Sequence, residues 1–483
     1  MILISLITII LELTSSMTYL QQAHYHLNEF VVYYKYLYKR LWWMYLVTTI
    51  LAFFNLWYLD SVVAVLYVLS WRFFVRRKIV KLNYTNRIKR TLVLSLLIYL
   101  SLLFTINYGF IVLISPILNI PIYIIISLIE KIILSTFMKK SRYKIRKICP
   151  EIIAVTGSAG KTSTKSIIHE LINGHMNTLK SPKSYNTIGG LSKFINNDLE
   201  IFTEMLVLEY GASYKGDIKK LCDFINVDYS VITNIASCHK KTFKSIDNII
   251  NEKMTLLQRT NKLCVVNNDD INIRNSLNKL KYNCRVVKVG KSNDSDYIIS
   301  DEVVCKEGIT FKLNGLEIKS NLIGYHNIYN ISFAVALIKE LKIKELNDYL
   351  ILDKLSVINQ TNNRLEMKSD LKGNIILDDS YNSNYFGFCN ALEVLKMYEN
   401  RVLITPGIVD SDNDINLSLI DKIIDSCDKV YIIESKSGNV IYDGLINKGY
   451  DKVIKVKSFK EAIVNVNSST VLIENDLPDI YLI

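Results

Sequence analysis

The 483-residue sequence lacks the cysteine spacing of a disulfide framework or of a zinc site. Its eight cysteines are scattered, none precedes Cys149, and no Cys-x-x-Cys pair occurs. This pattern predicts reduced thiols in a cytosolic part of the protein. The sequence also has no internal repeat and no low-complexity linker, which argues against a repeat architecture, and its length suits about three domains.

An acidic excess is missing as well. The sequence has 58 Lys and Arg residues against 46 Asp and Glu residues, which gives a formal net charge of +12. Such a balance can indicate a nucleic-acid partner. Here the basic residues cluster beside apolar segments, where membrane topology and anionic lipid account for them. We therefore expect a lipid bilayer, and no nucleic acid, among the partners.

Residues 1–148 are predicted to form an α-helical membrane domain with about five transmembrane helices. The chain is 50% hydrophobic with a mean hydropathy of +0.19, and much of the apolar excess lies in this first third. Several apolar runs approach the length of ~20 residues that crosses a bilayer. The runs are Ile2–Leu20, Leu41–Leu59, Val62–Phe74, Thr91–Ile106 and Phe110–Leu134.

Two of these runs admit another interpretation. The third run is short and could be re-entrant. The first could be a signal peptide, but it has no basic n-region and no small-residue cleavage site, and it contains Glu12. We therefore predict that the first run is a transmembrane helix.

The basic clusters between the runs predict the orientation of the chain. Lys and Arg gather at residues 35–40, 76–90 and 139–147, and all four tryptophans lie near predicted span ends. Five spans with the N-terminus outside would place all three clusters in the cytosol. Residues from 149 onward would then lie in the cytoplasm, below a multi-pass anchor or a groove for a lipid-linked substrate.

Residues 152–164, with the sequence IIAVTGSAGKTST, predict a phosphate-binding loop. Four apolar residues lead into a glycine turn, and a helix follows with apolar residues from Ile167 on one face. The turn lets backbone N–H groups face phosphates, the helix N-terminus adds its dipole, Lys161 adds a charge, and the Thr162 hydroxyl can bind Mg²⁺. Because Val155 stands where the strict pattern has its first glycine, the match is to the shorter Thr-Gly-x-x-Gly-Lys-Thr form.

After this loop, strand-like and helical segments alternate, which predicts a parallel sheet covered on both faces. Ligands of such sheets bind at the carboxyl ends of the strands. The strand at 205–208 delivers Glu209 to such an end, and the strand at 229–232 leads towards His239. Three further polar features are the loop Tyr185–Gly190, the helical stretch Glu252–Met254 and the segment Gly324–Asn330.

Taken together and in this order, these features resemble the Mur ligase family, the ATP-dependent amide-forming enzymes of bacterial peptidoglycan synthesis. Residues Asn363–Glu366 and Ile375–Asn384 look like the start of that family's C-terminal domain. The run Asp378–Asn382 is most similar to the MurF-like branch, which adds D-alanyl-D-alanine to a muramoyl tripeptide.

The resemblance implies an α/β fold behind the membrane domain. We expect a P-loop parallel-sheet ATP-binding domain at residues 149–360 and a Rossmann-like C-terminal domain at residues 361–483. It also implies a reaction in which a carboxylate attacks the γ-phosphate of ATP and releases ADP, and an amino acid or dipeptide then attacks the acyl phosphate, which forms the amide and releases phosphate. The expected partners are a carboxylate-bearing cell-wall precursor and this amine, with ATP and Mg²⁺ as cofactors.

The resemblance further implies roles for individual residues. Those expected to hold the phosphates of ATP are Gly157, Ser158, Gly160, Lys161 and Thr162. Those expected to bind Mg²⁺ are Thr162, Glu209 and His239. Those expected to act in catalysis are Lys161, His239 and Lys253, the last matching a lysine that is carbamylated in many members. Those expected to contact adenine, ribose or phosphates elsewhere are His326, Asn327, Arg364 and Asp379. Those expected near the carboxylate substrate are Asn186 and Thr187.

Simpler roles remain open for some of these residues. Lys253 could be a surface lysine on an amphipathic helix, and Arg364 could form a structural ion pair in a linker. Asp378 and Asp379 could belong to a strand-ending turn.

The front of the chain departs from the family, whose soluble members begin with a small domain that grips the UDP part of their substrate. Predicted membrane spans occupy that place here. We therefore expect a substrate other than a UDP-sugar peptide, or another way of recognising UDP. Two alternative functions are a poly-γ-glutamate or other peptide-polymer synthase, and a membrane ATPase that uses the phosphate loop for transport or regulation.

Overall fold

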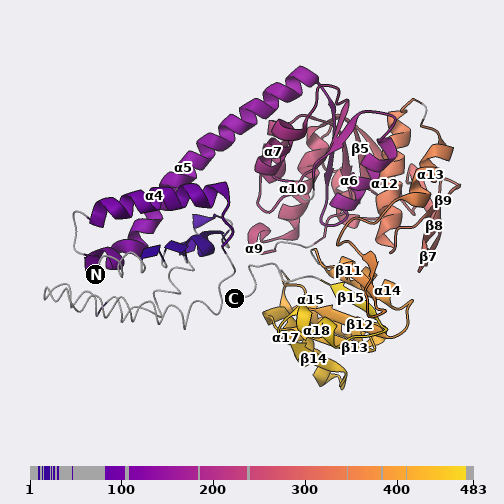
Figure 1. Cartoon of the computed structure of the whole chain (residues 1–483). Coiled ribbons are helices and arrows are strands. Elements are labelled where there is room, and N and C mark those ends of the chain that lie inside the picture. Colours follow the sequence, from indigo (N-terminus) through magenta and orange to yellow (C-terminus); the bar gives the residue numbers. More distant parts are fainter. Residues whose placement is uncertain are drawn as a thin grey trace. The chain divides into compact units, whose positions relative to one another are not determined.

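The computed structural model describes residues 82–103, 108–182, 185–236, 240–344, 346–381, 384–409 and 411–474, and scattered positions before residue 47. The predicted run Val62–Phe74 lies outside the described residues, and Ile2–Leu20 and Leu41–Leu59 lie mostly outside them. The chain divides into two compact units, and the second, which begins at Phe137, contains both β-sheets (Figure 1).

Two helices of the first part carry the later apolar runs, α4 (Asn86–Leu103) and α5 (Tyr108–Ile148). Within the part of the chain that the structure describes, one stretch is long and apolar enough to cross a membrane, Leu118–Ile148 of α5. It overlaps the last of the five predicted runs. The prediction of about five transmembrane helices is therefore not confirmed.

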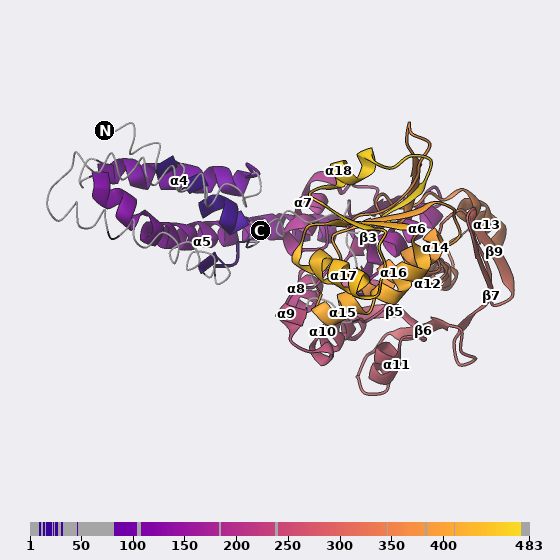
Figure 2. The same cartoon turned by 90° about the horizontal axis from the view of Figure 1, so that it is seen from below.

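The central sheet has nine strands in the order β2-β3-β1-β4-β5-β6-β7-β8-β9. Neighbours from β2 to β7 pair in parallel, and β7, β8 and β9 form an antiparallel extension at one edge (Figure 2). The strands are β1 (Glu151–Thr156), β2 (Thr178–Lys180), β3 (Met205–Glu209), β4 (Val227–Ile232), β5 (Thr260–Asn267), β6 (Arg285–Gly290), β7 (Tyr297–Cys305), β8 (Gly308–Leu313) and β9 (Leu316–Ser320).

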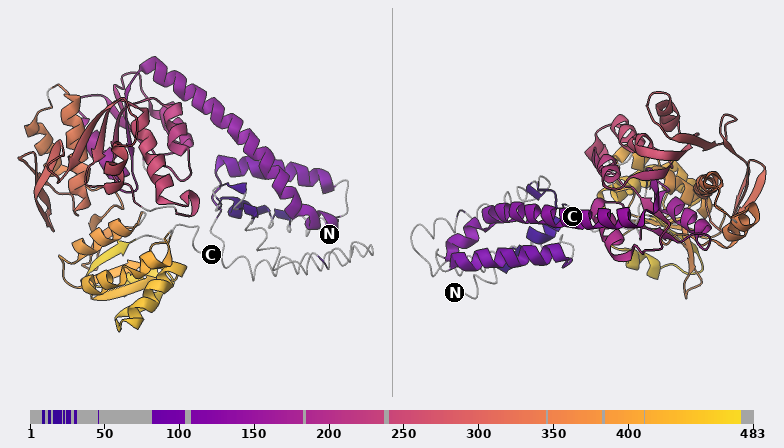
Figure 3. Two further views of the ribbon diagram at one scale, coloured as in Figure 1. Left: turned by 180° about the vertical axis from the view of Figure 1, so that it is seen from behind. Right: turned by 90° about the horizontal axis from the view of Figure 1, so that it is seen from above.

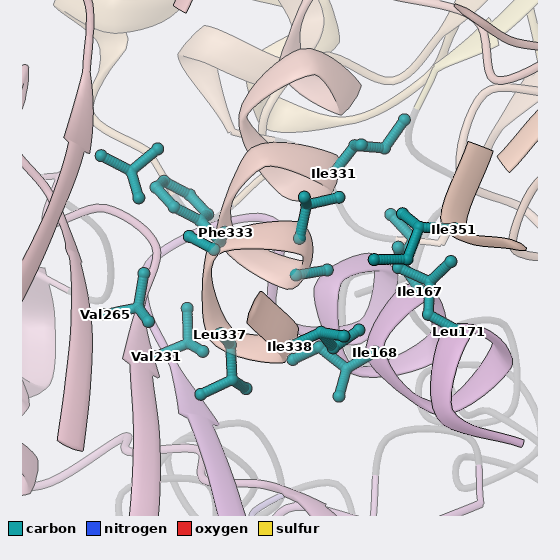
Figure 4. Close-up of a cluster of buried hydrophobic side chains, with 14 of the residues drawn as sticks. Ile167, Ile168, Leu171, Val231, Val265, Ile331, Phe333, Leu337, Ile338 and Ile351 are labelled. Carbon is teal, nitrogen blue, oxygen red and sulfur yellow. The ribbon is translucent and has the colours of Figure 1, made fainter. Parts of the chain in front are cut away.

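Helices cover both faces of this sheet, as the alternating pattern predicted (Figure 3). Alternate residues of β1 pack to opposite sides: Ile153 and Val155 join α6 and α12, whereas Ile152 and Ala154 join α7 and α8. Figure 4 shows the first of these clusters, in which side chains of α6 and α12 meet those of β4, β5 and α13. The helices are α6 (Lys161–Ile172), α7 (Ile188–Asp198), α8 (Asp217–Phe224), α9 (Lys240–Phe243), α10 (Ile246–Arg259), α11 (Ile271–Leu277), α12 (His326–Leu341) and α13 (Asp348–Val357).

Burial on both faces explains why the core strands have continuous apolar sequences instead of an alternating pattern. All five residues of β3 are buried, including the charged Glu209 at its end. Helix α12 is buried around most of its circumference, from Asn327 to Ile338, which explains its alanine-rich apolar sequence.

The last turns of α5 belong to the second unit because they pack on the central domain. Ile145 and Ile148 contact the α7–α8 cluster, and the Ser141 hydroxyl donates to the carbonyl oxygen of Ser192 at 3.1 Å. The predicted domain boundary at residue 148 stays a prediction, but this compact unit already begins at Phe137.

The second sheet has six strands in the order β10-β11-β15-β12-β13-β14, and all of its pairs are parallel except β10 with β11. Helices alternate with the strands, as expected for the C-terminal α/β domain. The strands are β10 (Glu366–Ser369), β11 (Ile375–Asp379), β12 (Arg401–Thr405), β13 (Lys429–Ile433), β14 (Val453–Val456) and β15 (Thr470–Glu474). The helices are α14 (Tyr385–Leu395), α15 (Asn413–Leu417), α16 (Ile420–Ser426), α17 (Lys436–Asn447) and α18 (Phe459–Val464).

Candidate nucleotide-binding and active site

The loop between β1 and α6 has the geometry of a phosphate cradle. Gly160 has a φ of 76°, in the left-handed region that favours glycine, and a Cβ there would lie 2.6 Å from Oδ1 of Asn330. A Cβ on Gly157 would lie 1.9 Å from Oγ1 of Thr233. Helix α6 begins immediately after Gly160, which supplies no side-chain cap. The N–H groups of its first turn therefore form a site suited to an anion.

The end of β4 holds the back of this loop. The Ala159 N–H donates to Oδ1 of Asn234 at 2.7 Å, and the Thr233 hydroxyl donates to the carbonyl oxygen of Ala159 at 2.5 Å. The predicted phosphate-binding residue Ser158 donates its hydroxyl to the Ala236 carbonyl at 3.0 Å and accepts from the Ala236 N–H. In this structure the Ser158 side chain thus fixes the loop conformation.

Glu209 lies at the carboxyl end of β3, beside the phosphate loop, and is only 2% exposed. Its Oε2 accepts from the Thr162 hydroxyl at 2.8 Å and from Lys165 Nζ at 3.3 Å, and its Oε1 accepts from Nδ2 of Asn186 at 3.2 Å. Burial by itself would raise the pKa of this carboxyl. The charges of Lys161 and Lys165 and the hydrogen bonds outweigh burial, so the pKa lies below its usual value.

Two lysines approach the loop from opposite sides. Lys161 Nζ and Lys253 Nζ donate to the same carbonyl oxygen, that of Gly157, at 2.9 and 2.8 Å. Lys253 is 4% exposed, so it is not the surface lysine of the simpler alternative. The neighbouring Glu252 accepts from the N–H groups of Gly216 and Ile218, at the start of α8, at 2.6 Å each. Helix α10 therefore presents an anion to one helix end and a cation to the phosphate loop.

The predicted substrate residues lie on the loop before α7. The carbonyl oxygen of Asn186 accepts from the Gly211 N–H at 3.0 Å, which holds the loop against the end of β3. Thr187 is the N-cap of α7, and its hydroxyl accepts from the Gly190 N–H at 3.4 Å. Asn186 is thus adjacent to Glu209, whereas the Thr187 side chain caps a helix; substrate contact by either residue stays a prediction.

The start of α12 contributes a buried imidazole. Nδ1 of His326 is buried and makes no hydrogen bond, and burial, aided by the charge of Arg364, lowers the pKa of His326 to about 4. The ring is therefore neutral near pH 7 and has an unused polar atom, which suits a ligand group. The Asn327 amide donates to the carbonyl of Ile323 at 2.8 Å and its Oδ1 accepts from Asn330, so it organises the loop.

Arg364 and Asp379 lie in the C-terminal part of the unit. The Arg364 guanidinium lies over the ring of Tyr381, 4.5 Å from its centroid, and the Leu365 N–H donates to Asp379 Oδ1 at 3.1 Å. Burial raises the pKa of Asp379 to about 6, although Arg364 and a hydrogen bond with Glu474 oppose the shift. The neighbouring Asp378 accepts from Lys368 and Ser380, as a residue of a strand-ending turn does.

His239 lies outside the described residues, so its predicted metal and catalytic roles remain predictions. Among the residues that the structure describes, no group of three or more His, Cys, Asp or Glu side chains is placed to hold a metal ion. A hydroxyl and one carboxylate, Thr162 and Glu209, do provide oxygen ligands of the kind Mg²⁺ uses when phosphates complete its coordination.

Three residues of the site were not among the predicted ones. Lys165 is one helical turn after Lys161 and bonds to Glu209, which i to i+4 spacing along the predicted helix could have suggested. Asn330 accepts from the Thr164 hydroxyl at 3.1 Å and joins α12 to α6. Asn234 is the third, and only the tertiary fold brings it to the loop.

One family model matches the part of the chain that carries this arrangement. Residues 155–338 match the Mur ligase middle domain. The match begins in β1, includes the phosphate loop, Glu209 and Lys253, and ends in α12.

Curated relatives point to the same family. The chain is 27% identical over 278 residues to the UDP-N-acetylmuramoyl-tripeptide–D-alanyl-D-alanine ligase of Bacillus subtilis, over 56% of this chain and 59% of the relative. The ligase of the same name from Borreliella burgdorferi is 30% identical over 256 residues, 51% of this chain and 52% of the relative. The chain thus spans about half to three-fifths of the length of these relatives.

Solved structures share the α/β fold with parallel sheets. MurF ligase from Thermotoga maritima in complex with ADP has a TM-score of 0.62 at 23% identity, covering 72% of this chain and 81% of that one. MurF from Acinetobacter baumannii has a TM-score of 0.61 at 19% identity, with 70% and 76% covered. The fold after the membrane-helix candidate is therefore that of the Mur ligases.

Proposed function

We propose that the protein is an ATP-dependent ligase that joins a carboxylate to an amino acid or a dipeptide through an acyl phosphate, in the synthesis of peptidoglycan. The relatives with matching central regions are named as ligases of this pathway. The alternative peptide-polymer synthase differs in its amine, and the alternative membrane ATPase would need no acyl acceptor.

The observation that carries the proposal is the grouping at the ends of β1 and β3. The glycine loop, Lys161 and the first turn of α6 form a cradle for phosphates, and the buried Glu209 is hydrogen-bonded to Thr162 at its edge. This cradle fits a nucleoside triphosphate because it combines oriented N–H groups with the ammonium group of Lys161. It fits Mg²⁺ because Thr162 and Glu209 both offer oxygen atoms.

In the proposed reaction Mg²⁺ would supply a positive charge between the phosphates and the attacking carboxylate. Lys161 would leave the Gly157 carbonyl and pair with the phosphate oxygens. Asn186 would help to orient the acid substrate, since its amide already lies beside Glu209. Lys253, whose ammonium group donates to the Gly157 carbonyl, would act at the same phosphate loop, with or without carbamylation.

Further nucleotide contacts are proposed for residues of α12 and of the C-terminal domain. His326, with its unpaired Nδ1, would face adenine together with the loop that Asn327 organises. Arg364 and Asp379 would reach the ribose or the phosphates from the C-terminal domain. Their contacts with Tyr381 and Leu365 hold them near the segment that joins the two domains.

We also propose that residues 1–148 anchor the catalytic domains, 149–360 and 361–483, on the cytoplasmic side of a bacterial membrane. Leu118–Ile148 supports this because it is long and apolar enough to cross a bilayer. The acceptor would then be a membrane-held, carboxylate-bearing cell-wall precursor. A fragment beginning at residue 135, which keeps the turns of α5 that pack on α7, tests this. It should use lipid-linked acceptor much less well than the full chain.

The activity is tested by phosphate release from ATP with detergent-purified full-length protein. D-alanyl-D-alanine and single amino acids are combined with UDP-linked and lipid-linked muramoyl peptides. Release that needs both an amine and an acid, and that disappears in Lys161→Ala, is expected. Release that is indifferent to every acceptor would instead support the membrane ATPase.

A further inference from the structure

Lys165 is a buried cation that none of the proposed roles uses. It lies on α6, one turn after Lys161, and its side chain is 1% exposed. Lysine is almost never fully buried unless it is paired. Its ion-pair partner is Glu209, at 3.3 Å between Nζ and Oε2, and Glu209 is the residue proposed to hold Mg²⁺.

The ion pair with Lys165 involves the Glu209 oxygen atom that also faces Thr162. Oε2 of Glu209 is the atom that meets the Thr162 hydroxyl at 2.8 Å, and it is also the atom that meets Lys165. Oε1 points instead to the Asn186 amide. A metal ion approaching Thr162 and Oε2 therefore meets a carboxylate whose charge a lysine already offsets.

The other lysines near Glu209 also disfavour the binding of a free metal ion. Lys161 and Lys165 both act electrostatically on Glu209, and Lys253 Nζ lies 2.8 Å from the Gly157 carbonyl of the same loop. Without nucleotide, two ammonium groups thus act on one carboxylate and a third lies at the adjacent loop, so a divalent cation would be repelled. The phosphates of a nucleotide reverse that balance, because they bring several negative charges to the loop.

We propose that Lys165 is a positioning residue and the internal counter-ion of Glu209. It keeps free Mg²⁺ out of the site until nucleotide phosphates arrive, so that metal and nucleotide enter together. The inference rests on the proposed function only in taking Thr162 and Glu209 as the metal site. A purely structural lysine would stabilise the buried Glu209 without affecting the affinity for metal.

Mn²⁺ binding to detergent-purified full-length protein, followed by electron paramagnetic resonance, tests this proposal. The Glu209→Gln variant gives the background from other sites. Wild-type protein should bind Mn²⁺ in a Glu209-dependent way with ADP present and much more weakly without it. In Lys165→Met, the affinity for free Mn²⁺ should rise by about tenfold or more, because one adjacent buried positive charge is gone.

Two control variants separate charge from packing. Lys165→Arg keeps the charge and should still exclude free Mn²⁺. Lys319→Met removes an exposed lysine that pairs with Glu317 at 3.0 Å, and it should leave Mn²⁺ binding unchanged.

Two results would overturn the proposal. One is unchanged or weaker binding of free Mn²⁺ by folded Lys165→Met. The other is equal Glu209-dependent binding by the wild type with and without ADP, which can be measured even if Lys165→Met does not fold. Neither measurement uses an acid or an amine substrate, so a failure of the ligase assay would not be mistaken for a failure of this inference.

Discussion

Glu209 and Asp379 occupy equivalent places in the two sheets, yet their acidities shift in opposite directions. Each is the last residue of its strand, β3 or β11, in an α/β sheet. Burial by itself would raise the pKa of both carboxyl groups. At Glu209 the charges of Lys161 and Lys165 prevail and lower the pKa, whereas at Asp379 burial prevails over Arg364 and the pKa is about 6.

The opposite pKa shifts follow from the charged side chains that neighbouring elements place beside each carboxyl group. Helix α6 places two lysines one turn apart beside Glu209. Beside Asp379, the register of β11 with β15 places a second carboxyl, that of Glu474. At Asp379 the charge of Arg364 and the hydrogen bond with Glu474 lower the pKa, but burial outweighs them. Glu209 is therefore the stronger acid of the two, and Asp379 is the weaker.

The largest effect is expected from removing the central cation. Lys161→Ala should lower ATP turnover by a factor on the order of 10³, because developing charge on the phosphates loses its closest partner. Steady-state phosphate release and ADP binding would measure it. Lys319→Ala, which removes an exposed lysine from the same domain, should have little effect. Near-normal turnover in Lys161→Ala would remove the basis for calling this loop a phosphate site.

A matched pair of carboxyl-to-amide changes tests the comparison directly. Glu209→Gln should reduce kcat by about 10²-fold, because an amide cannot replace a charged metal ligand. Asp379→Asn should mainly raise KM for ATP, by about tenfold, since a nucleotide hydrogen bond is worth ~1–2 kcal/mol. Separate kcat and KM values for both variants are the measurement. Equal effects on kcat would show that the two strand ends are not specialised.

Much of the central strand end could be predicted from the sequence, because its signals are local. The strand, glycine turn and Lys161-Thr162 follow one another within 13 residues, and Glu209 directly follows an apolar run. The parallel sheet was predictable for the same reason. Each strand's apolar sequence and each helix's spacing are properties of short segments.

The rest depends on contacts between distant segments. The i to i+4 spacing places Lys165 on the same helix face as Lys161, but only the packing of α6 on β3 shows that Lys165 is buried. The Asp379–Glu474 pair depends on a strand register that joins residues nearly a hundred positions apart. Thr187 matched a substrate position in the family pattern, whereas its visible role is to cap α7. No local pattern distinguishes these outcomes.

A smaller effect is expected in the pH dependence of stability. The pKa of Asp379 is raised from 3.8 to about 6 on folding, so the folded protein binds more protons than the unfolded chain between these values. The contribution of Asp379 to the free energy of unfolding is therefore fully present below about pH 4 and is lost as the pH rises through about 6. Asp379→Asn should lack this decline. Amide hydrogen exchange in β11 and β15 from pH 4 to 7 would measure it, and parallel pH profiles would contradict it.

The smallest effect is expected where α5 meets the central domain, far from both carboxyl groups. Arg142 Nη2 donates to the carbonyl of Asp223 at 2.9 Å and Lys144 Nζ to that of Asn196 at 2.8 Å, near the C-termini of α8 and α7. A cation at a helix C-terminus contributes ~0.3–1 kcal/mol.

Arg142→Ala and Lys144→Ala should each lower the stability of the central domain by about that amount and leave ADP affinity unchanged. Exposed Lys147→Ala, on the same helix, is the matched control for general charge. Thermal unfolding with and without ADP would separate an effect on the stability of the central domain from an effect on its affinity for ADP. A loss of ADP affinity in Lys144→Ala would mean that α7 transmits strain from α5 to Asn186, so the central strand end would depend on the helix that precedes it as well as on its own lysines.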